Sequence, residues 1–100
     1  MKYIVKVSKI AKSDIIKVYD YIEQMLFAPS AAEDFLRGIY ACIAKLETHA
    51  DIFAVSTFLD VLHYGKNART VHFKNWIVIY TIHGRFVLVH RIIHDSLFIK

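Results

Sequence analysis

Residues 76–93 of the chain read W-I-V-I-Y-T-I-H-G-R-F-V-L-V-H-R-I-I. Two apolar runs, Trp76–Ile82 and Arg85–Ile93, are separated in this stretch by the dipeptide His83-Gly84. Runs rich in β-branched and aromatic residues predict strands, and a two-residue connection with glycine predicts a tight hairpin between them. Because both runs are almost continuously apolar, we expect them to be central strands that are buried on both faces.

Two further strands are predicted, one on each side of the hairpin in the sheet. Ala68–Phe73 has strand composition and is connected to the hairpin by the tight turn Lys74-Asn75. Tyr3–Val7, which reads Y-I-V-K-V, is a short strand at the N-terminus. We therefore expect a four-stranded antiparallel sheet, in which the N-terminal strand completes a C-terminal meander.

Between the first strand and the meander, the apolar residues take the spacing of two amphipathic helices. The first predicted helix has Ser8 as its N-cap and is broken by Ala28-Pro29, because proline disfavours helical geometry in the residue before it. The second begins with a capping box at Ser30–Glu33 and continues to about Thr48. The two apolar stripes consist of Ala11, Ile15, Val18, Tyr19, Ile22 and Leu26, and of Ala32, Phe35, Ile39, Ile43 and Leu46. The short link predicts an antiparallel helical hairpin.

These elements predict an α+β fold of two layers, with a helical hairpin packed on an antiparallel sheet in the order βααβββ. Residues 51–67 carry apolar side chains without a clean period, so we expect a compact connection there, with a turn at Gly65 and Asn67. A chain of 100 residues has the length of one domain, and we expect residues 1–100 to form it.

The composition excludes several classes of protein. Hydrophobic residues make up 56% of the chain, which has only three glycines and one proline, so it is neither disordered nor fibrous. Cys42, the only cysteine, is expected in the core and implies no oxidising compartment. There is no run long enough for a signal peptide or a membrane span, which predicts a cytoplasmic protein without a membrane partner. The net charge of +4 permits an acidic partner but does not identify one.

The order of elements and four local motifs resemble the RelE/ParE toxin superfamily, which includes the plasmid-stabilisation toxins. The motifs are V-S-x-x-A-x-x-D-I-x-x-V-x-x-Y-I over residues 7–22, P-x-A-A-x-x-F-L-x-x-I over 29–39, Arg69 followed by F-K-N-W-I-V-I-Y over 73–80, and V-L-V-H-R-I-I-H over 87–94. The resemblance covers nearly the whole chain except residues 51–67. Its most distinctive part is the arginine that is followed three residues later by histidine.

The resemblance implies a small growth inhibitor of a type II toxin–antitoxin system, held inactive by a cognate antitoxin that wraps it. ParE-like members poison DNA gyrase, whereas RelE-like members cleave messenger RNA in the ribosome. Many RNA-cleaving members have a basic residue directly after the aromatic residue of the central strand, but here Trp76 is followed by Ile77. The ParE-like hypothesis is therefore favoured over a RelE-like endoribonuclease, and a degenerate module that binds antitoxin without toxicity is the third hypothesis.

Candidate site residues lie in and beside the meander. Cleavage of RNA through its 2′-hydroxyl needs an acid, a base and cations that hold the phosphate. If the chain is a nuclease, Arg91 and His94 are the expected catalytic residues, because arginine grips phosphate and histidine titrates near neutrality. Residues expected to bind nucleic acid or another target are Arg69, Lys74, Arg85 and Arg91. The alternatives are that Arg69 and Lys74 are solubilising charges and that His94 is a solvated terminal histidine.

Strand alternation sorts the residues of the last strand onto two faces. One face would carry Val87, Val89, Arg91 and Ile93, and the other Phe86, Leu88, His90 and Ile92. Since the helices cover only one face, we expect Arg91 on an open face and His90 packed toward the helices. An arginine within an apolar strand needs a partner, which is either a bound ligand or an internal acid such as Asp14.

No cofactor or metal site is predicted, because His49, His63 and His83 lack the spacing of metal ligands. On the central strand, Trp76, Val78, Tyr80 and Ile82 share a face that we expect in the core. Exposed apolar residues on the helices are predicted to form a groove for the antitoxin or for self-association into a homodimer. They are Ile16, Met25, Phe27 and Leu36.

Overall fold

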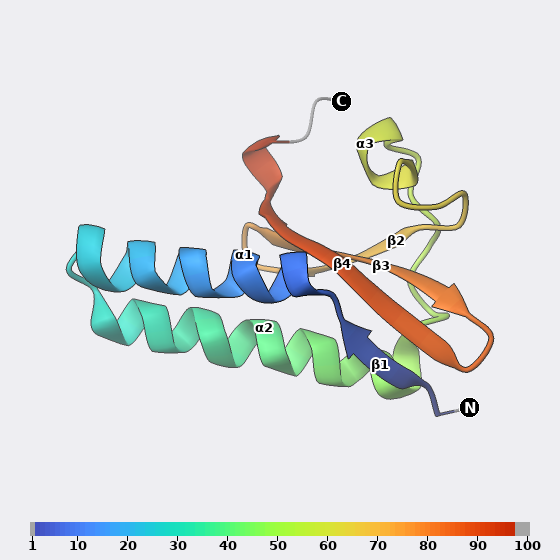
Figure 1. Ribbon diagram of the computed structural model, residues 1–100, viewed down its shortest axis with the longest axis horizontal. Coiled ribbons are helices and arrows are strands. Elements are labelled where there is room, and N and C mark those ends of the chain that lie inside the picture. The colour runs from blue at the N-terminus through green and yellow to red at the C-terminus, as the bar shows by residue number, and fades with distance from the viewer. Residues whose placement is uncertain (1, 98–100) are drawn as a thin grey trace.

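The computed structural model describes residues 2–97 and confirms the α+β fold with the order βααβββ. Its elements are β1 (Ile4–Val7), α1 (Lys9–Asp20), the π-helical turn η1 (Tyr21–Met25), α2 (Pro29–His49), the short helix α3 (Leu59–Leu62), β2 (Arg69–Phe73), β3 (Trp76–His83), β4 (Phe86–His94) and the 3-10 turn η2 (Asp95–Leu97). Figure 1 shows α1 and α2 side by side, with their connection pointing away from the sheet.

The sheet has the strand order β1-β4-β3-β2. The meander pairs in antiparallel fashion as expected, but β1 runs parallel to β4, with Ile4 opposite Phe86 and Val7 opposite Val89. The expectation of a purely antiparallel sheet is therefore wrong, and the sheet is mixed. The physical reason is the connection, because a helical hairpin between β1 and the meander is long enough to return the chain to the same end of the sheet.

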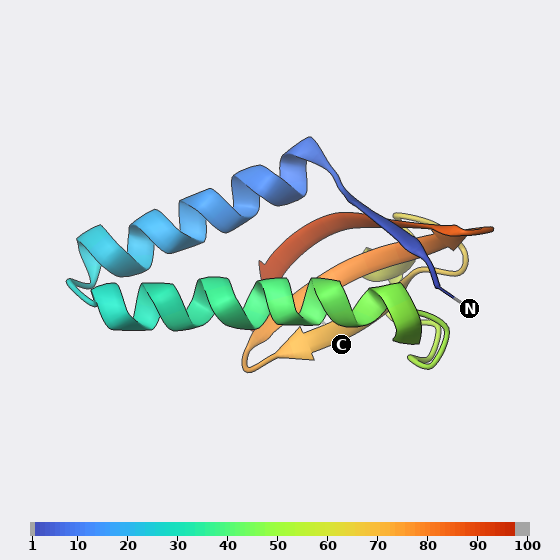
Figure 2. The ribbon, with the colours of Figure 1, turned by 90° about the horizontal axis from the view of Figure 1, so that it is seen from below.

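The helical hairpin covers one face of the sheet (Figure 2). The predicted core face of β3 is confirmed, since Val78 and Tyr80 are fully buried and Trp76 and Ile82 pack against the same cluster. The helices contribute Ala11, Ile15, Phe35, Ile39, Cys42, Ile43 and Leu46. Inside this core the Tyr80 hydroxyl donates to the carbonyl of Ala50 at 2.6 Å, which satisfies a buried polar group.

The opposite face of the sheet is covered as well, which corrects the expectation that it would be open. Residues of the 51–67 segment cross it, and Val61 is fully buried against Ile77 and Ile79. Phe58 and Tyr64 pack at the margin of this second cluster. The segment is compact as expected. Its apolar residues follow neither a helical nor a strand period, so no sequence pattern indicated that they form a second small core with β3.

Local signals were confirmed in part. Ser8 is the N-cap of α1, since its Oγ accepts from the amide of Ala11 at 3.0 Å. The capping box at Ser30–Glu33 is wrong, because α2 starts at Pro29, which needs no amide partner in the first turn. The hairpin turn is Gly84-Arg85, one residue later than predicted, because Gly84 takes the positive φ of +60° and His83 still pairs with Phe86.

Within residues 2–97, none of the helices combines the length and the apolar character that crossing a bilayer would require.

Candidate functional site

A β-bulge at His90 organises the candidate site. Ile79 pairs with Arg91 and Tyr80 with Val89, so His90 is the extra residue of β4. Val87 and Val89 before the bulge lie in the helix-facing core, as Ile92 does after it. His90 and Arg91 both contact Tyr64 on the other side of the sheet. The expectation that His90 packs toward the helices is therefore wrong, as is the common face expected for Val87, Val89 and Arg91, because simple alternation cannot anticipate a bulge.

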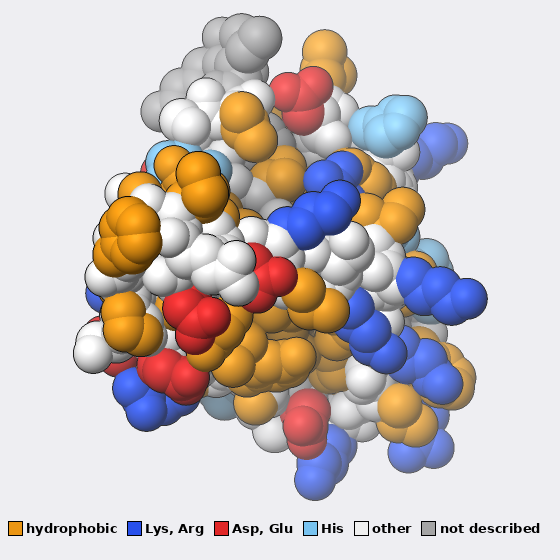
Figure 3. All heavy atoms as spheres, turned by 60° about the vertical axis from the view of Figure 1, so that its left-hand side comes forward, with side chains coloured by type: hydrophobic (Ala, Val, Ile, Leu, Met, Phe, Trp, Pro, Cys, Tyr) orange, Lys and Arg blue, Asp and Glu red, His pale blue; other side chains and the backbone are white. Residues whose placement is uncertain are grey.

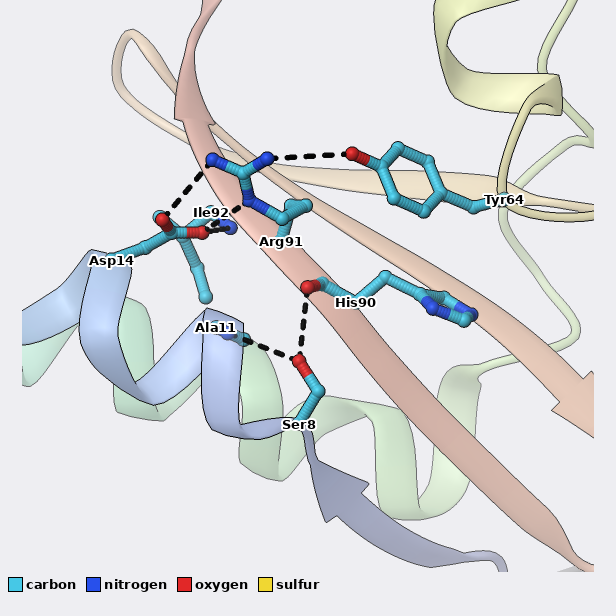
Figure 4. A network of polar contacts seen from close by, with 7 residues as sticks. All are labelled: Ser8, Ala11, Asp14, Tyr64, His90, Arg91 and Ile92. Carbon is cyan, nitrogen blue, oxygen red and sulfur yellow. Dashed lines mark hydrogen bonds and ion pairs between the residues drawn. The ribbon is translucent and has the colours of Figure 1, made fainter.

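Arg91 has an internal acid as its partner, and this acid is Asp14, the alternative that the sequence left open (Figure 4). The guanidinium donates from Nε to Oδ2 at 2.8 Å and from Nη2 to Oδ1 at 3.2 Å. Tyr64 lies on its remaining side, 3.5 Å from Nη1. The hydrogen bonds to Asp14 raise the pKa of Arg91 above its ordinary value. The side chains of Arg91 and Asp14 are 33% and 12% exposed, so this is a largely shielded ion pair.

Beyond the end of β1, Ser8 and Asp14 form the hydrogen bonds to the backbone of β4 that a longer strand would form. The amide of Ser8 donates to the carbonyl of Val89 at 3.0 Å, and its hydroxyl donates to the carbonyl of His90 at 3.0 Å. One turn further along α1, Asp14 Oδ2 accepts from the amide of Ile92 at 3.0 Å. Side chains of the first turns of α1 thus satisfy backbone groups of β4 that no strand pairs with (Figure 4). Because Asp14 also binds Arg91, the position of the guanidinium is fixed by contacts within the fold.

His94 lies on the other face of β4 from Arg91. After the bulge the strand alternates regularly, and His94 pairs with Trp76, whose ring packs against Phe35 of α2 at 5.1 Å. The His94 ring stands edge-on to Trp76 at 5.0 Å, and its Nδ1 accepts from the amide of Ser96 at 3.2 Å. The structure therefore does not bring the two expected catalytic residues together.

The expected target-binding cations are dispersed as well. Arg69 donates from Nη1 to the carbonyls of Asp51 at 3.0 Å and Phe53 at 2.6 Å, so it fastens the 51–67 segment to β2. Lys74 is exposed in the β2–β3 turn and Arg85 in the β3–β4 turn, which lie at opposite ends of β3. These residues do not converge on one phosphate-sized site, and their roles as target contacts stay a prediction.

A polar cluster that the sequence did not reveal lies beside the bulge. The fully buried hydroxyl of Thr81 is 2.6 Å from Nε2 of His83 and 2.8 Å from Nε2 of His90. The His90 ring packs against Tyr64 at 5.4 Å. Thr81 and His83 are two residues apart on a strand, which was a usable signal for one side of this cluster. The place of His90 depends on the bulge, for which the sequence gives no signal.

Acid is expected to weaken the fold through His90. Burial, and then the neighbouring His83, lower the pKa of His90. Because the folded state disfavours the charged ring, His90 does not lower the free energy of unfolding above about pH 6.5, the ordinary pKa of histidine. Its contribution to stability is lost as the pH falls through the lowered pKa. Urea unfolding of the wild type and of His90→Gln between roughly pH 8 and pH 5 measures this. The variant should show a weaker pH dependence, the exposed control His72→Gln should behave as the wild type, and identical slopes for all three would contradict the assignment.

An apolar groove runs between the two long helices. It has a volume of about 320 Å³ and is lined by Lys12, Ile15, Ile16, Tyr19, Leu36 and Tyr40. Ile16 and Leu36 were among the residues expected to form such a groove. Met25 and Phe27 do not line it and lie at the end of the hairpin. No cluster of possible metal ligands occurs among residues 2–97.

Comparisons with known proteins agree with this geometry. The family model described as the ParE toxin of the type II toxin–antitoxin system parDE matches residues 5–96. A chain of the solved structure described as the chromosomal ParDE TA system from P. aeruginosa superposes with a TM-score of 0.76 at 18% sequence identity, covering 93% of this chain and 96% of that chain. At this identity the superposition shows a shared fold. None of the curated proteins matches the sequence.

Proposed function

The chain belongs to the family of ParE toxins of type II toxin–antitoxin systems, and on this premise we propose that it stops growth by binding DNA gyrase, without catalysing a reaction of its own. As the toxin component of such a system, it has a cognate antitoxin as its partner. The choice of gyrase over the ribosome is the proposal, and so is action in the cytoplasm.

The observation that carries the proposal is the engagement of Arg91 by Asp14. A nuclease of this fold would need a cation free to hold the phosphate, together with an acid or base beside it. The Arg91 guanidinium is hydrogen-bonded to Asp14 and Tyr64. His94 lies on the other face of β4. Ile77 stands where many RNA-cleaving relatives have a basic residue. These features support inhibition by binding.

The groove between α1 and α2 is the proposed antitoxin site. Ile16 and Tyr40 on its rim are 61% and 51% exposed, and together with the apolar lining of the groove they form a contiguous apolar surface that a partner could cover. An amphipathic antitoxin segment would bury them by the helix-in-groove mode of recognition.

Expression of the toxin without antitoxin tests the target. We expect filamentation and induction of the SOS response in cells, and inhibition of supercoiling by purified gyrase. Blocked translation with cut messenger RNA would overturn the proposal in favour of an endoribonuclease. Normal growth and full gyrase activity would overturn it in favour of an antitoxin-binding module without toxicity.

A further inference from the structure

The end of the helical hairpin carries large apolar side chains that are more than half exposed. Tyr21, Met25, Leu26 and Phe27 are 55%, 68%, 54% and 86% exposed, and we call these four residues the hairpin tip. The tip projects away from the sheet (Figure 1), and none of the four residues lines the groove between the helices. The fold therefore gains little from these side chains.

Phe27 is held in a conformation that glycine would adopt more easily. Its φ is +52°, in the left-handed region, between two hydrogen bonds that end the first helix: Leu26 amide to Tyr21 carbonyl at 3.2 Å and Ala28 amide to Ile22 carbonyl at 3.1 Å. Glycine is the usual residue at such a helix end, because a side chain there is strained. The sequence has a phenylalanine that is both strained and exposed, a combination that points to a contact outside the chain.

Acidic side chains surround the tip. Asp20, Glu23, Glu33 and Asp34 lie next to it in the sequence of the hairpin, although the chain as a whole has a net charge of +4. Asp34 is paired with Arg37 at 2.9 Å, so Asp20, Glu23 and Glu33 form the acidic rim. The Tyr19 hydroxyl donates to Glu33 at 2.8 Å and lies 3.3 Å from a carboxylate oxygen of Glu23. The hydrogen bond to Glu33, followed by burial and the charge of Glu23, raises the pKa of Tyr19 to about 12. Figure 3 shows red side chains gathered among orange ones on the face where the hairpin end comes forward.

We propose that the hairpin tip is the surface that contacts the target enzyme, with Phe27 inserted into an apolar pocket that is surrounded by basic residues. The acidic rim makes nucleic acid and anionic membranes unfavourable partners, because like charges repel. A protein surface that holds DNA is basic and so complements this rim. Binding hot spots typically place a large side chain in a desolvated pocket of the partner, with a polar rim around it. The inference rests on the proposed function, since it names the surface that acts on gyrase.

Replacement of Phe27 tests this inference without risk to the fold. Phe27→Gly relieves the strained φ while it removes the ring, so its melting temperature should equal or exceed that of the wild type. We expect the concentration for half-inhibition of gyrase supercoiling to rise at least tenfold for Phe27→Gly and Phe27→Ala, with unchanged binding of the antitoxin. The matched control is Leu59→Ala, at a side chain that is 83% exposed on α3, and it should stay within about twofold of the wild type.

The rim is tested by charge reversal. Asp20→Lys should weaken inhibition at low salt and less so at high salt, whereas Asp60→Lys, at an exposed position on α3, should not. Wild-type inhibition by Phe27→Gly would overturn the inference and leave the proposed function standing. A wild-type protein that does not inhibit gyrase would overturn the proposed function and the inference with it. A Phe27→Gly variant that dissociates a dimer but inhibits fully would instead assign the tip to a second copy of the chain.

Discussion

Replacing Asp14 with alanine is expected to lower the free energy of unfolding by about 3 kcal/mol. The substitution leaves the Arg91 guanidinium without its carboxylate and the Ile92 amide without an acceptor. Loss of one partner of a buried ion pair costs about 3–5 kcal/mol, and we take the lower end because the Arg91 side chain is 33% exposed. Urea denaturation followed by circular dichroism measures the change.

Asp14→Asn is the matched control. The asparagine Oδ1 can still accept from the Ile92 amide, whereas its Nδ2 replaces the oxygen that accepts from Arg91 Nη2. The charge and one hydrogen bond of the pair are lost but the Ile92 amide keeps its acceptor, so the destabilisation should be smaller than that of Asp14→Ala. If Asp14→Ala were as stable as the wild type, Arg91 would not depend on its internal partner, and the structural role given to it would be wrong.

The second large effect is expected at Phe35, which joins α2 to the sheet. Its ring is 3% exposed and meets Trp76 edge to face at 5.1 Å. Phe35→Ala should lower the free energy of unfolding by about 4 kcal/mol, because it opens a large cavity and removes an aromatic pair. Since Trp76 is the only tryptophan, its fluorescence should also shift to the red as water reaches the indole.

Phe86→Ala provides the comparison for Phe35→Ala. Phe86 has the same side chain but is 46% exposed on the β1–β4 surface, so its loss should cost about 1 kcal/mol or less. Equal destabilisation by both substitutions would contradict the packing of α2 on this face of the sheet.

The fold could be predicted from the sequence because its main signals are local. The apolar period of residues 9–26 and 32–46, the break at Pro29 and the two runs at 76–93 each define an element without reference to the rest. The direction of β1 was not readable, because a four-residue strand pairs equally well in either direction until the path of the helices is known. The covering of the opposite face of the sheet by residues 51–67 was not readable either, because this segment has only one short helix and therefore no apolar period.

The candidate site was harder to predict, because it depends on one inserted residue. The bulge at His90 changes which side chains share a face, and it leaves no mark in the pattern of apolar residues. The need of Arg91 for a partner could be inferred from its apolar surroundings, and Asp14 could be named because the first helix follows β1 directly. The separation of Lys74 from Arg85 follows from the predicted meander, because the two turns lie at opposite ends of β3. The engagement of Arg69 by the carbonyls of Asp51 and Phe53 could not be foreseen, since it depends on the path of residues 51–67.

The hairpin tip illustrates a further limit of pattern analysis. The sequence pattern groups Met25 and Phe27 with Ile16 and Leu36, because all four are apolar residues of the predicted helices. The structure separates them into a groove and a tip, because the first helix ends in a π-helical turn at Tyr21–Met25. The antitoxin and the target enzyme are therefore proposed to bind adjacent but different surfaces of the hairpin.

The most direct measurement of the central claim, that Arg91 serves the fold and the toxin acts by binding, is gyrase inhibition by the double variant Asp14→Asn, Arg91→Met. It removes both charges of the pair while an acceptor for the Ile92 amide remains, so the variant should stay folded. We predict that it binds antitoxin and inhibits supercoiling within about threefold of the wild type. A folded, antitoxin-binding double variant that no longer inhibits gyrase or growth would contradict the account.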